Sequence, residues 1–195
     1  MQTPDLIKVL PQYIYRYSDL GQIDFARSFA REKAQYHPGA GNLITTQDQY
    51  RIPELKPLID FVEGYGDDVL QRLQIPGKFT IVSCWFTQTY PGQQFEPHFH
   101  PLAMIAGSYY LSDQLSPCVF IGENQWLQHP LSHPVDVATP VEFNVGDLVF
   151  IPASMRHGVP GTNNLREVFS FNAVLTDAGT CDTVRQNFVE MPPVY

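Results

Sequence analysis

Cysteine is scarce in this sequence of 195 residues, which contains only Cys84, Cys118 and Cys181. Their number is odd, they lie far apart, and none of them forms a CxxC pair. The pattern therefore indicates neither a disulfide framework nor a structural zinc site. We expect the protein to work in a reducing compartment.

Basic residues are also few, with 12 Lys and Arg against 20 Asp and Glu and a formal net charge of −8. Nucleic acids and anionic membranes are bound through clustered basic side chains, which this chain does not show. The N-terminus has no basic stretch leading into a hydrophobic segment, and no apolar run approaches the length of a bilayer span. We therefore expect a soluble, cytoplasmic protein that binds neither nucleic acid nor membrane.

The sequence does contain 17 prolines, 13 glycines and 13% aromatic residues, with 16% charged residues. This mixture is typical of many short strands joined by turns and not of a helical bundle. The length suits one domain with a substantial core. We expect a single domain over residues 1–195, made of an N-terminal region (1–77), an all-β core (78–175) and a C-terminal tail (176–195).

The N-terminal region is predicted to contain one strand and two helices. Residues 6–17 are largely apolar but are broken by Pro11, which allows an edge strand and disfavours a central one. Residues 22–36 repeat apolar side chains at intervals of three and four, with an acidic residue early and basic residues late, as in an amphipathic helix. The segment 37–42 is expected to be a loop, and a second helix is expected to begin near Pro53 and to end near residue 73.

From residue 79 onwards the sequence has the character of β-strands. Residues 79–90 are apolar on both faces, which predicts a strand buried between the helices and a barrel interior. Further strands are predicted at residues 102–111, 118–121, 135–143, 148–152 and 167–175. This number of short strands favours a double-stranded β-helix, a jelly-roll or cupin-like fold, with the N-terminal α-helices packed on one sheet.

Three histidines are the candidate metal ligands. His98 and His100 are two residues apart, so on a strand both would project from one face and share an ion. Neutral histidine is a common ligand for zinc, iron, copper and nickel, and two such ligands need a third. The best donor is His157, shortly after the strand predicted at 148–152. Three ligands on one side would leave the other side of the metal open for a co-substrate and for dioxygen or water.

Arg166 is the candidate for binding an anion. It shares one face of a predicted strand with Val168, Ser170 and Asn172, while two phenylalanines lie on the other face. If the polar face is turned inward, the buried guanidinium needs an anion, and its parallel donors match a carboxylate. A dicarboxylate or keto acid on the metal would then be held by Arg166 at its far end. The alternative is a surface residue at the start of a strand, paired with an acid such as Glu167.

Four motifs follow one another along the chain: His98-Phe99-His100-Pro101, Ala106-Gly107-Ser108-Tyr109-Tyr110-Leu111, Gly146-Asp147-Leu148-Val149-Phe150-Ile151-Pro152 through His157, and Arg166 to Phe171-Asn172. Together they resemble one family, the iron(II)/2-oxoglutarate-dependent oxygenases often found in marine bacteria and cyanophages. The resemblance covers residues 79–175. It implies a double-stranded β-helix, Fe(II) as the metal and 2-oxoglutarate as the co-substrate.

The same resemblance implies a dioxygenase, an oxidoreductase that hydroxylates an unidentified substrate, in the host cytoplasm if the gene is carried by a phage. We expect that substrate to be a small molecule or a peptide. Position by position, His98 matches the first metal histidine, His157 the distal histidine, and Arg166 the residue that holds 2-oxoglutarate. We expect His98, His157 and Arg166 to be catalytic and His100 to complete the metal site. We expect Ser170 to supply a hydroxyl to 2-oxoglutarate. One of the adjacent residues Tyr109 and Tyr110 could supply another, and we assign this role to Tyr109.

His100 departs from the wider superfamily, in which most members have Asp or Glu at this position. A neutral imidazole in place of a carboxylate leaves the Fe(II) site one charge more positive. Three-histidine iron sites also occur in thiol dioxygenases of the cupin class, which need no 2-oxoglutarate. That alternative and a non-enzymatic metal-binding jelly roll stay open at this stage, as does a homodimer.

Overall fold

The computed structural model describes residues 2–9, 12–39, 42–112, 117–123, 136–177 and 184–185. Most of the predicted C-terminal tail therefore lies outside the described residues. The helices are α1 (Ile23–Glu32) and α2 (Lys56–Arg72), with the 3-10 turns η1 (Gln49–Arg51) and η2 (Pro53–Leu55). The strands are β1 (Asp5–Val9), β2 (Gln12–Tyr17), β3 (His37–Gly39), β4 (Asn42–Ile44), β5 (Lys78–Thr89), β6 (Phe95–His98), β7 (Ile105–Tyr110), β8 (Cys118–Glu123), β9 (Asp136–Val141), β10 (Leu148–Pro152), β11 (Arg156–Val159) and β12 (Arg166–Thr176).

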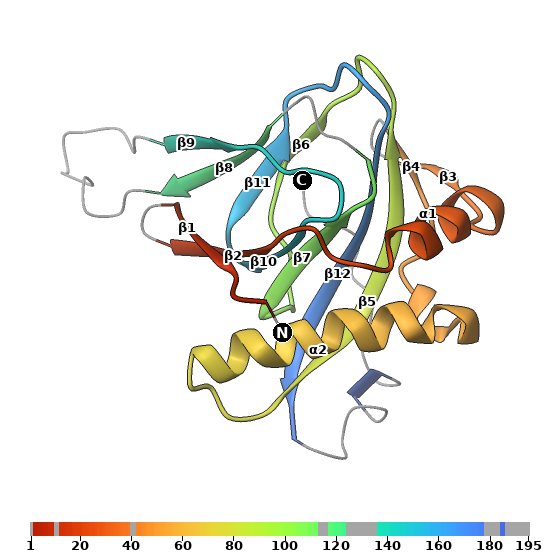
Figure 1. Ribbon diagram of the computed structural model, residues 1–195. Coiled ribbons are helices and arrows are strands. Elements are labelled where there is room, and N and C mark those ends of the chain that lie inside the picture. The colour runs from red at the N-terminus through yellow and green to blue at the C-terminus, as the bar shows by residue number, and fades with distance from the viewer. Residues whose placement is uncertain are drawn as a thin grey trace.

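The strands form two sheets (Figure 1). The larger sheet has the order β1-β2-β10-β7-β12-β5-β4-β3, and the smaller has the order β6-β11-β8-β9. All pairings between these strands are antiparallel. The prediction of a β core is thus confirmed, and its sheets are antiparallel.

The two helices cover one face of the large sheet, with α2 packed against β5 (Figure 1). The three-and-four spacing of α1 puts its small and aromatic apolar residues inward, and Ala26, Phe29 and Ala30 are buried. Phe29 stacks on Phe86 of β5, with the ring centroids 5.6 Å apart. This face of the sheet is filled by packing, so the opposite face is left to build a site.

The opposite face of the large sheet packs against the small sheet. The shared core contains residues of both sheets, namely Ile14, Ala106, Tyr110, Val149, Ile151 and Val168 from the large sheet and Cys118, Phe120 and Val159 from the small sheet. The two sheets therefore enclose a second interior, which is separate from the helix-side core. The polar residues discussed below lie in this interior.

A β-bulge at Val82 reverses the faces of β5 partway along the strand. The pairing with β12 skips this residue, because Asn172 is opposite Ser83 and the next residue of β12 is opposite Ile81. One extra residue shifts the alternation of side chains by one. Unbroken alternation would put Trp85 on the same face as Ile81, but Ile81 lies in the helix-side core and Trp85 lines the site. The predicted strand is present, but the prediction that its side chains alternate without interruption between the two faces is wrong.

Two N-terminal predictions also need correction. The described residues of 6–17 belong to two strands, β1 and β2, which pair with each other, and β2 pairs with β10 on its other side. The segment 37–42, expected to be a loop, contributes β3 and β4, and β4 pairs with β5. In both places the pairing partner is far away in the sequence, and local propensity carries no information about it.

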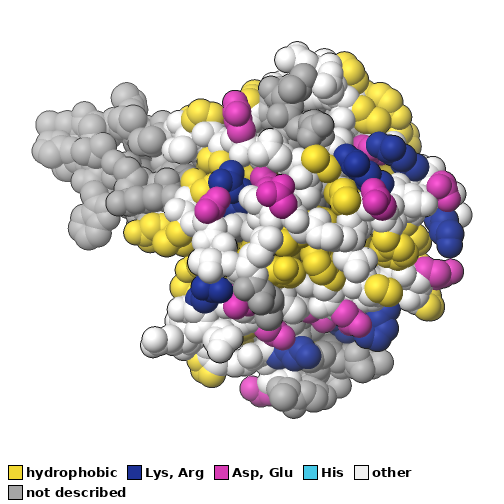
Figure 2. All heavy atoms as spheres, in the orientation of Figure 1, with side chains coloured by type: hydrophobic (Ala, Val, Ile, Leu, Met, Phe, Trp, Pro, Cys, Tyr) yellow, Lys and Arg dark blue, Asp and Glu magenta, His cyan; other side chains and the backbone are white. Residues whose placement is uncertain are grey.

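The surface carries charges of both signs. On the face shown in Figure 2, described acidic and basic side chains are interspersed and do not gather into a basic patch. Exposed ion pairs such as Lys56 with Asp60 contribute about 0–1 kcal/mol each, so packing rather than surface charge holds the fold. Among the residues that the structure describes, no helix is long and apolar enough to cross a membrane.

Candidate metal centre and anion pocket

His98 and His157 face each other across two strands of the small sheet. In the antiparallel pair of β6 and β11, His157 is directly opposite His98, and the centroids of the two rings are 4.7 Å apart. Directly opposed residues project their side chains from the same face. Because β11 also pairs with β8 on its other side, His157 sits on an interior strand of this sheet.

His100 joins the other two histidines from outside the strand on which it was predicted. β6 ends at His98, and the backbone N–H of His100 instead donates to the carbonyl oxygen of Ala153, at 2.9 Å. Its ring stacks on Trp85, with the centroids 6.1 Å apart and the planes 27° from parallel. The expected convergence of the pair is present, but a turn and a tertiary contact produce it instead of strand alternation.

The three histidines direct ring nitrogens toward a common point. Their ligand atoms lie within 4.8 Å of one another, and the Nε2 atoms of His100 and His157 are 3.4 Å apart. The Nδ1 atoms of His98 and His157 lie 2.9 Å from the carbonyl oxygens of Glu96 and Met155 respectively, so each Nδ1–H can donate to one. A proton held on Nδ1 leaves the Nε2 lone pair free for a metal. Three imidazole donors on one side suit iron, zinc, copper or nickel.

Burial keeps these imidazoles neutral. Desolvation is the largest cause in each case: it lowers the pKa of His98, lowers the pKa of His100 to about 3, and lowers the pKa of His157 well below the ordinary 6.5. The closeness of His98 lowers the pKa of the other two further. Because a proton and a metal compete for the same lone pair, a cluster that is neutral at pH 7 is ready to bind a cation.

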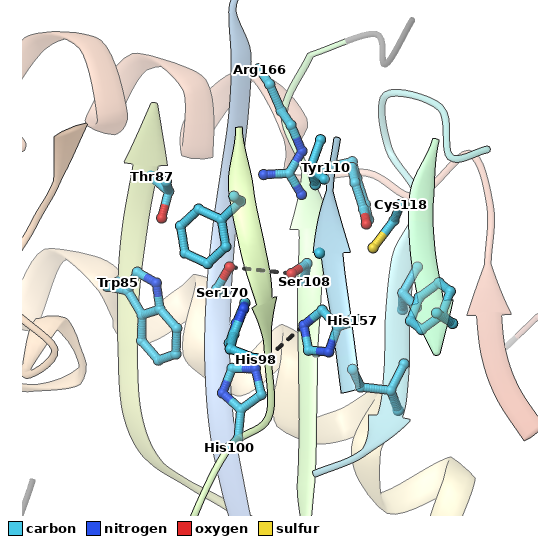
Figure 3. A pocket seen from close by; sticks show the side chains of 17 residues that line it. Trp85, Thr87, His98, His100, Ser108, Tyr110, Cys118, His157, Arg166 and Ser170 are labelled. Atoms are coloured by element: carbon cyan, nitrogen blue, oxygen red, sulfur yellow. Dashed lines mark hydrogen bonds between the residues drawn. The ribbon is translucent and has the colours of Figure 1, made fainter. Parts of the chain in front are cut away.

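Arg166 lies at the other end of the same pocket, at the first residue of β12 (Figure 3). The residue is 9% exposed, and its guanidinium carbon is 5.5 Å from the centroid of the Tyr110 ring. No ion pair between residues that the structure describes includes Arg166. Glu167 points to the other face, where it pairs with Arg31 at 2.6 Å. The alternative of a surface arginine paired with Glu167 is therefore wrong, and a buried cation of this kind favours an anionic ligand.

Tyr110, and not Tyr109, belongs to the Arg166 end of the pocket. The two are adjacent and point to opposite faces of β7. Tyr109 faces the helices, where its hydroxyl donates to the carbonyl oxygen of Leu20 at 3.0 Å. The expectation that Tyr109 binds 2-oxoglutarate is therefore wrong. Ser170 does line the pocket, between its two ends, with its Oγ 3.2 Å from that of Ser108 (Figure 3).

Three further residues line the pocket and were not assigned to it from the sequence. Trp85 and Thr87 reach it because the bulge at Val82 turns this half of β5 toward the small sheet. No signal within this strand's own sequence marked the bulge, because a bulge arises from the pairing with another strand. Cys118 lies near Arg166, and burial raises its pKa to about 11, so it remains a neutral thiol. The rest of the wall is apolar, with Phe95, Phe120, Val149, Ile151 and Val159.

Comparison with protein families gives one match, over residues 83–172, to the family described as "Putative 2OG-Fe(II) oxygenase". The matched span begins within β5 and ends within β12, and it includes the three histidines and Arg166. No curated protein matches the sequence.

Solved structures with the same fold are numerous. An oxidoreductase of the 2OG-Fe(II) oxygenase family from Burkholderia pseudomallei is 9% identical with a TM-score of 0.62, covering 82% of this chain and 83% of that chain. HygX from Streptomyces hygroscopicus, with nickel and 2-oxoglutarate bound, is 12% identical with a TM-score of 0.63, covering 84% and 83%. A Pseudomonas putida prolyl-4-hydroxylase is 14% identical with a TM-score of 0.60, covering 84% and 93%. At these identities the likeness establishes a shared fold.

Proposed function

We propose that this 2OG-Fe(II) oxygenase holds its iron through His98, His100 and His157 and holds 2-oxoglutarate through Arg166. The observation that carries the proposal is the arrangement of one pocket, with three neutral imidazoles at one end and a buried guanidinium at the other. A dicarboxylate with a keto-acid end would satisfy both groups at once, because the histidines would hold the metal that binds the keto acid and Arg166 would neutralise the far carboxylate.

Hydroxyl groups near Arg166 support a carboxylate at this end. Thr89 is directly opposite Arg166 across β5 and β12, and its Oγ1 is buried without a hydrogen-bond partner among the described residues. Thr87 and Tyr110 line the pocket close by. Buried hydroxyls normally have a partner, and carboxylate oxygens accept such bonds well. We assign Tyr110 and Thr87, in addition to Ser170, as the polar groups around the co-substrate.

Iron(II), when bound, supplies the activation of dioxygen that couples decarboxylation of 2-oxoglutarate to oxidation of a second substrate. The protein orients the reactants and excludes water. Trp85 stacks on His100 and Phe120 stacks on His157, so flat apolar rings restrict both ligands and their solvent access. Three neutral histidines would leave a bound iron(II) with its full double positive charge, which would favour a dianionic co-substrate.

We infer a hydroxylase acting on a small-molecule or peptide substrate. Support comes from the fold relatives, which include HygX with hygromycin B bound and prolyl hydroxylases. We further assign the chain to the marine bacterial and cyanophage type, as a single double-stranded β-helix domain over residues 1–195 working in the cytoplasm. The motif series around His98, His157 and Arg166 is the basis of that finer assignment.

An anaerobic titration tests the proposal. Fe(II) and 2-oxoglutarate, added together to the apo protein without oxygen, should produce a visible metal-to-ligand charge-transfer band. Admission of air should then give slow succinate formation without a second substrate. If the band is missing and no succinate forms, the assignment of iron and 2-oxoglutarate to this pocket is wrong. Oxygen uptake that needs a thiol and no 2-oxoglutarate would favour the three-histidine thiol dioxygenase.

A further inference from the structure

The Nδ1 atoms of two of the three candidate ligands have acceptors close by in the sequence. His98 and His157 each use the carbonyl oxygen two residues earlier, at 2.9 Å. His100 lies beyond the end of β6, where the chain turns through Leu102 at a φ of 65°. An acceptor for Nδ1–H of His100 therefore has to come from another part of the chain. Without such an acceptor, the ring would be free to adopt either neutral tautomer.

Asn172 of β12 lies on the side of the sheet that faces His100. It shares this face with Ser170, and it is opposite Ser83, which shares a face with Trp85. Trp85 in turn stacks on the His100 ring. The amide of Asn172 is thus on the side of the sheet next to His100, the candidate ligand that does not belong to a strand.

The hydrogen bonds of Asn172 leave one atom without a partner. Its Nδ2 donates to Ser83 Oγ at 3.1 Å, whereas its buried Oδ1 has no hydrogen bond of normal geometry to the described residues. The contact of this side chain with His100 raises the pKa of the imidazole, against the larger lowering caused by burial. A buried amide oxygen of this kind is costly unless a donor satisfies it.

We propose that Asn172 is a positioning residue that accepts a hydrogen bond from Nδ1–H of His100 through its Oδ1. This bond holds the ring in the tautomer whose Nε2 is free, and it orients that nitrogen toward the metal. Asn172 thereby does for His100 what the carbonyls of Glu96 and Met155 do for the other two ligands. The inference rests on the proposed metal centre, because it assigns a task to one of the three ligands.

The test uses Asn172→Leu, which keeps the branching and the number of heavy atoms and removes the acceptor, and Asn172→Asp, which keeps an acceptor. Ser83→Ala is the matched control, because it removes the neighbouring hydrogen bond and leaves Asn172 in place. In the apo proteins, long-range 1H–15N NMR reports which nitrogen of His100 carries the proton. Anaerobic titration with Co(II), a spectroscopic probe of the same ligands, reports metal affinity.

In the wild-type protein and in Ser83→Ala we expect His100 to carry its proton on Nδ1. Asn172→Leu should populate both tautomers and bind Co(II) about tenfold to a hundredfold more weakly. Asn172→Asp should keep the Nδ1 proton, shift its resonance downfield, and bind Co(II) within a few-fold of wild type.

Two kinds of failure are distinguishable. If the wild-type protein binds no Co(II) and no Fe(II), the proposed metal centre itself is wrong. If the wild-type protein binds metal and Asn172→Leu keeps both the Nδ1 tautomer and the affinity, the role of Asn172 is overturned. Equal losses in Asn172→Leu and Ser83→Ala, or an unchanged His100 resonance in Asn172→Asp, would overturn it as well.

Discussion

His157 lies directly opposite His98 in the pairing of β6 with β11, and their ring centroids are 4.7 Å apart. A pair of ligands fixed by backbone hydrogen bonds needs little rearrangement to bind an ion, which is the arrangement that favours tight and selective metal binding. The third ligand, His100, completes the cluster from a turn.

Removing either member of the opposed pair should abolish iron binding. His98→Ala or His157→Ala leaves two imidazoles, which are too few to hold Fe(II) firmly in an open site. Metal analysis after anaerobic loading with Fe(II) and desalting measures the occupancy. His37→Ala, at an exposed histidine of β3, is the control and should load like wild type. Full iron occupancy in His157→Ala would show that the metal binds at another site.

Position 100 should accept a carboxylate. His100→Asp should retain iron, because it restores the two-histidine, one-carboxylate ligand set common for non-haem Fe(II), whereas His100→Ala should lose it. Both variants remove the stacking with Trp85, so a difference between them reports ligation rather than packing. Fe(II) titration followed by tryptophan fluorescence distinguishes them. Iron binding by His100→Ala equal to wild type would exclude this residue as a ligand.

Arg166 should govern the affinity for 2-oxoglutarate and leave iron binding intact. A charge-assisted pair with a carboxylate contributes about 1.5–3 kcal/mol, which corresponds to a loss of about tenfold to a hundredfold in affinity for Arg166→Ala. Arg166→Lys should recover part of the loss, since an ammonium keeps the charge without the two-point fork. Titration with 2-oxoglutarate, followed by the charge-transfer band, measures the affinity of both variants. Arg156→Ala, at an exposed arginine of β11, should behave like wild type.

The stability of the metal-free protein should fall in mild acid. The pKa values of the three histidines are lowered in the folded state, so between those values and about 6.5 the unfolded chain binds more protons. The free energy of unfolding is then highest above pH 6.5 and decreases as the pH falls toward 3. Its slope against pH corresponds to the uptake on unfolding of up to one proton per histidine. Urea unfolding between pH 7 and pH 5 measures this. The triple variant His98→Gln, His100→Gln, His157→Gln should show a shallower dependence.

Gly107 should tolerate no side chain. A Cβ there would lie 2.2 Å from the carbonyl oxygen of Val149 and 2.4 Å from a ring atom of Phe171, because β7 is held between β10 and β12. Gly107→Ala should lower the free energy of unfolding by about 1–3 kcal/mol or more, as overpacking does. Gly64→Ala, in α2 with nothing within 4 Å of the new Cβ, should instead raise it by up to about 1 kcal/mol. Chemical denaturation compares the two, and a stable Gly107→Ala would contradict the close packing.

The faces of β12 could be predicted because its alternation is unbroken around the site. Arg166, Val168 and Ser170 face the space between the sheets, while Phe169 and Phe171 lie in the helix-side core. The same period-2 rule failed on β5, where the bulge at Val82 shifts the phase. A bulge is a property of the pairing between two strands, so one strand's sequence does not reveal it.

By itself the sequence determined the chemical types in the site: three histidines able to bind a metal and an arginine able to bind a carboxylate. It also determined the amphipathic spacing that buries one face of α1. Only the tertiary structure decided that Tyr110 rather than Tyr109 faces Arg166, and that His100 joins the other two histidines from a turn. The physical reason is that residue type and local periodicity are encoded along the chain, whereas register, bulges and turn contacts arise from hydrogen bonds and packing between segments far apart in it.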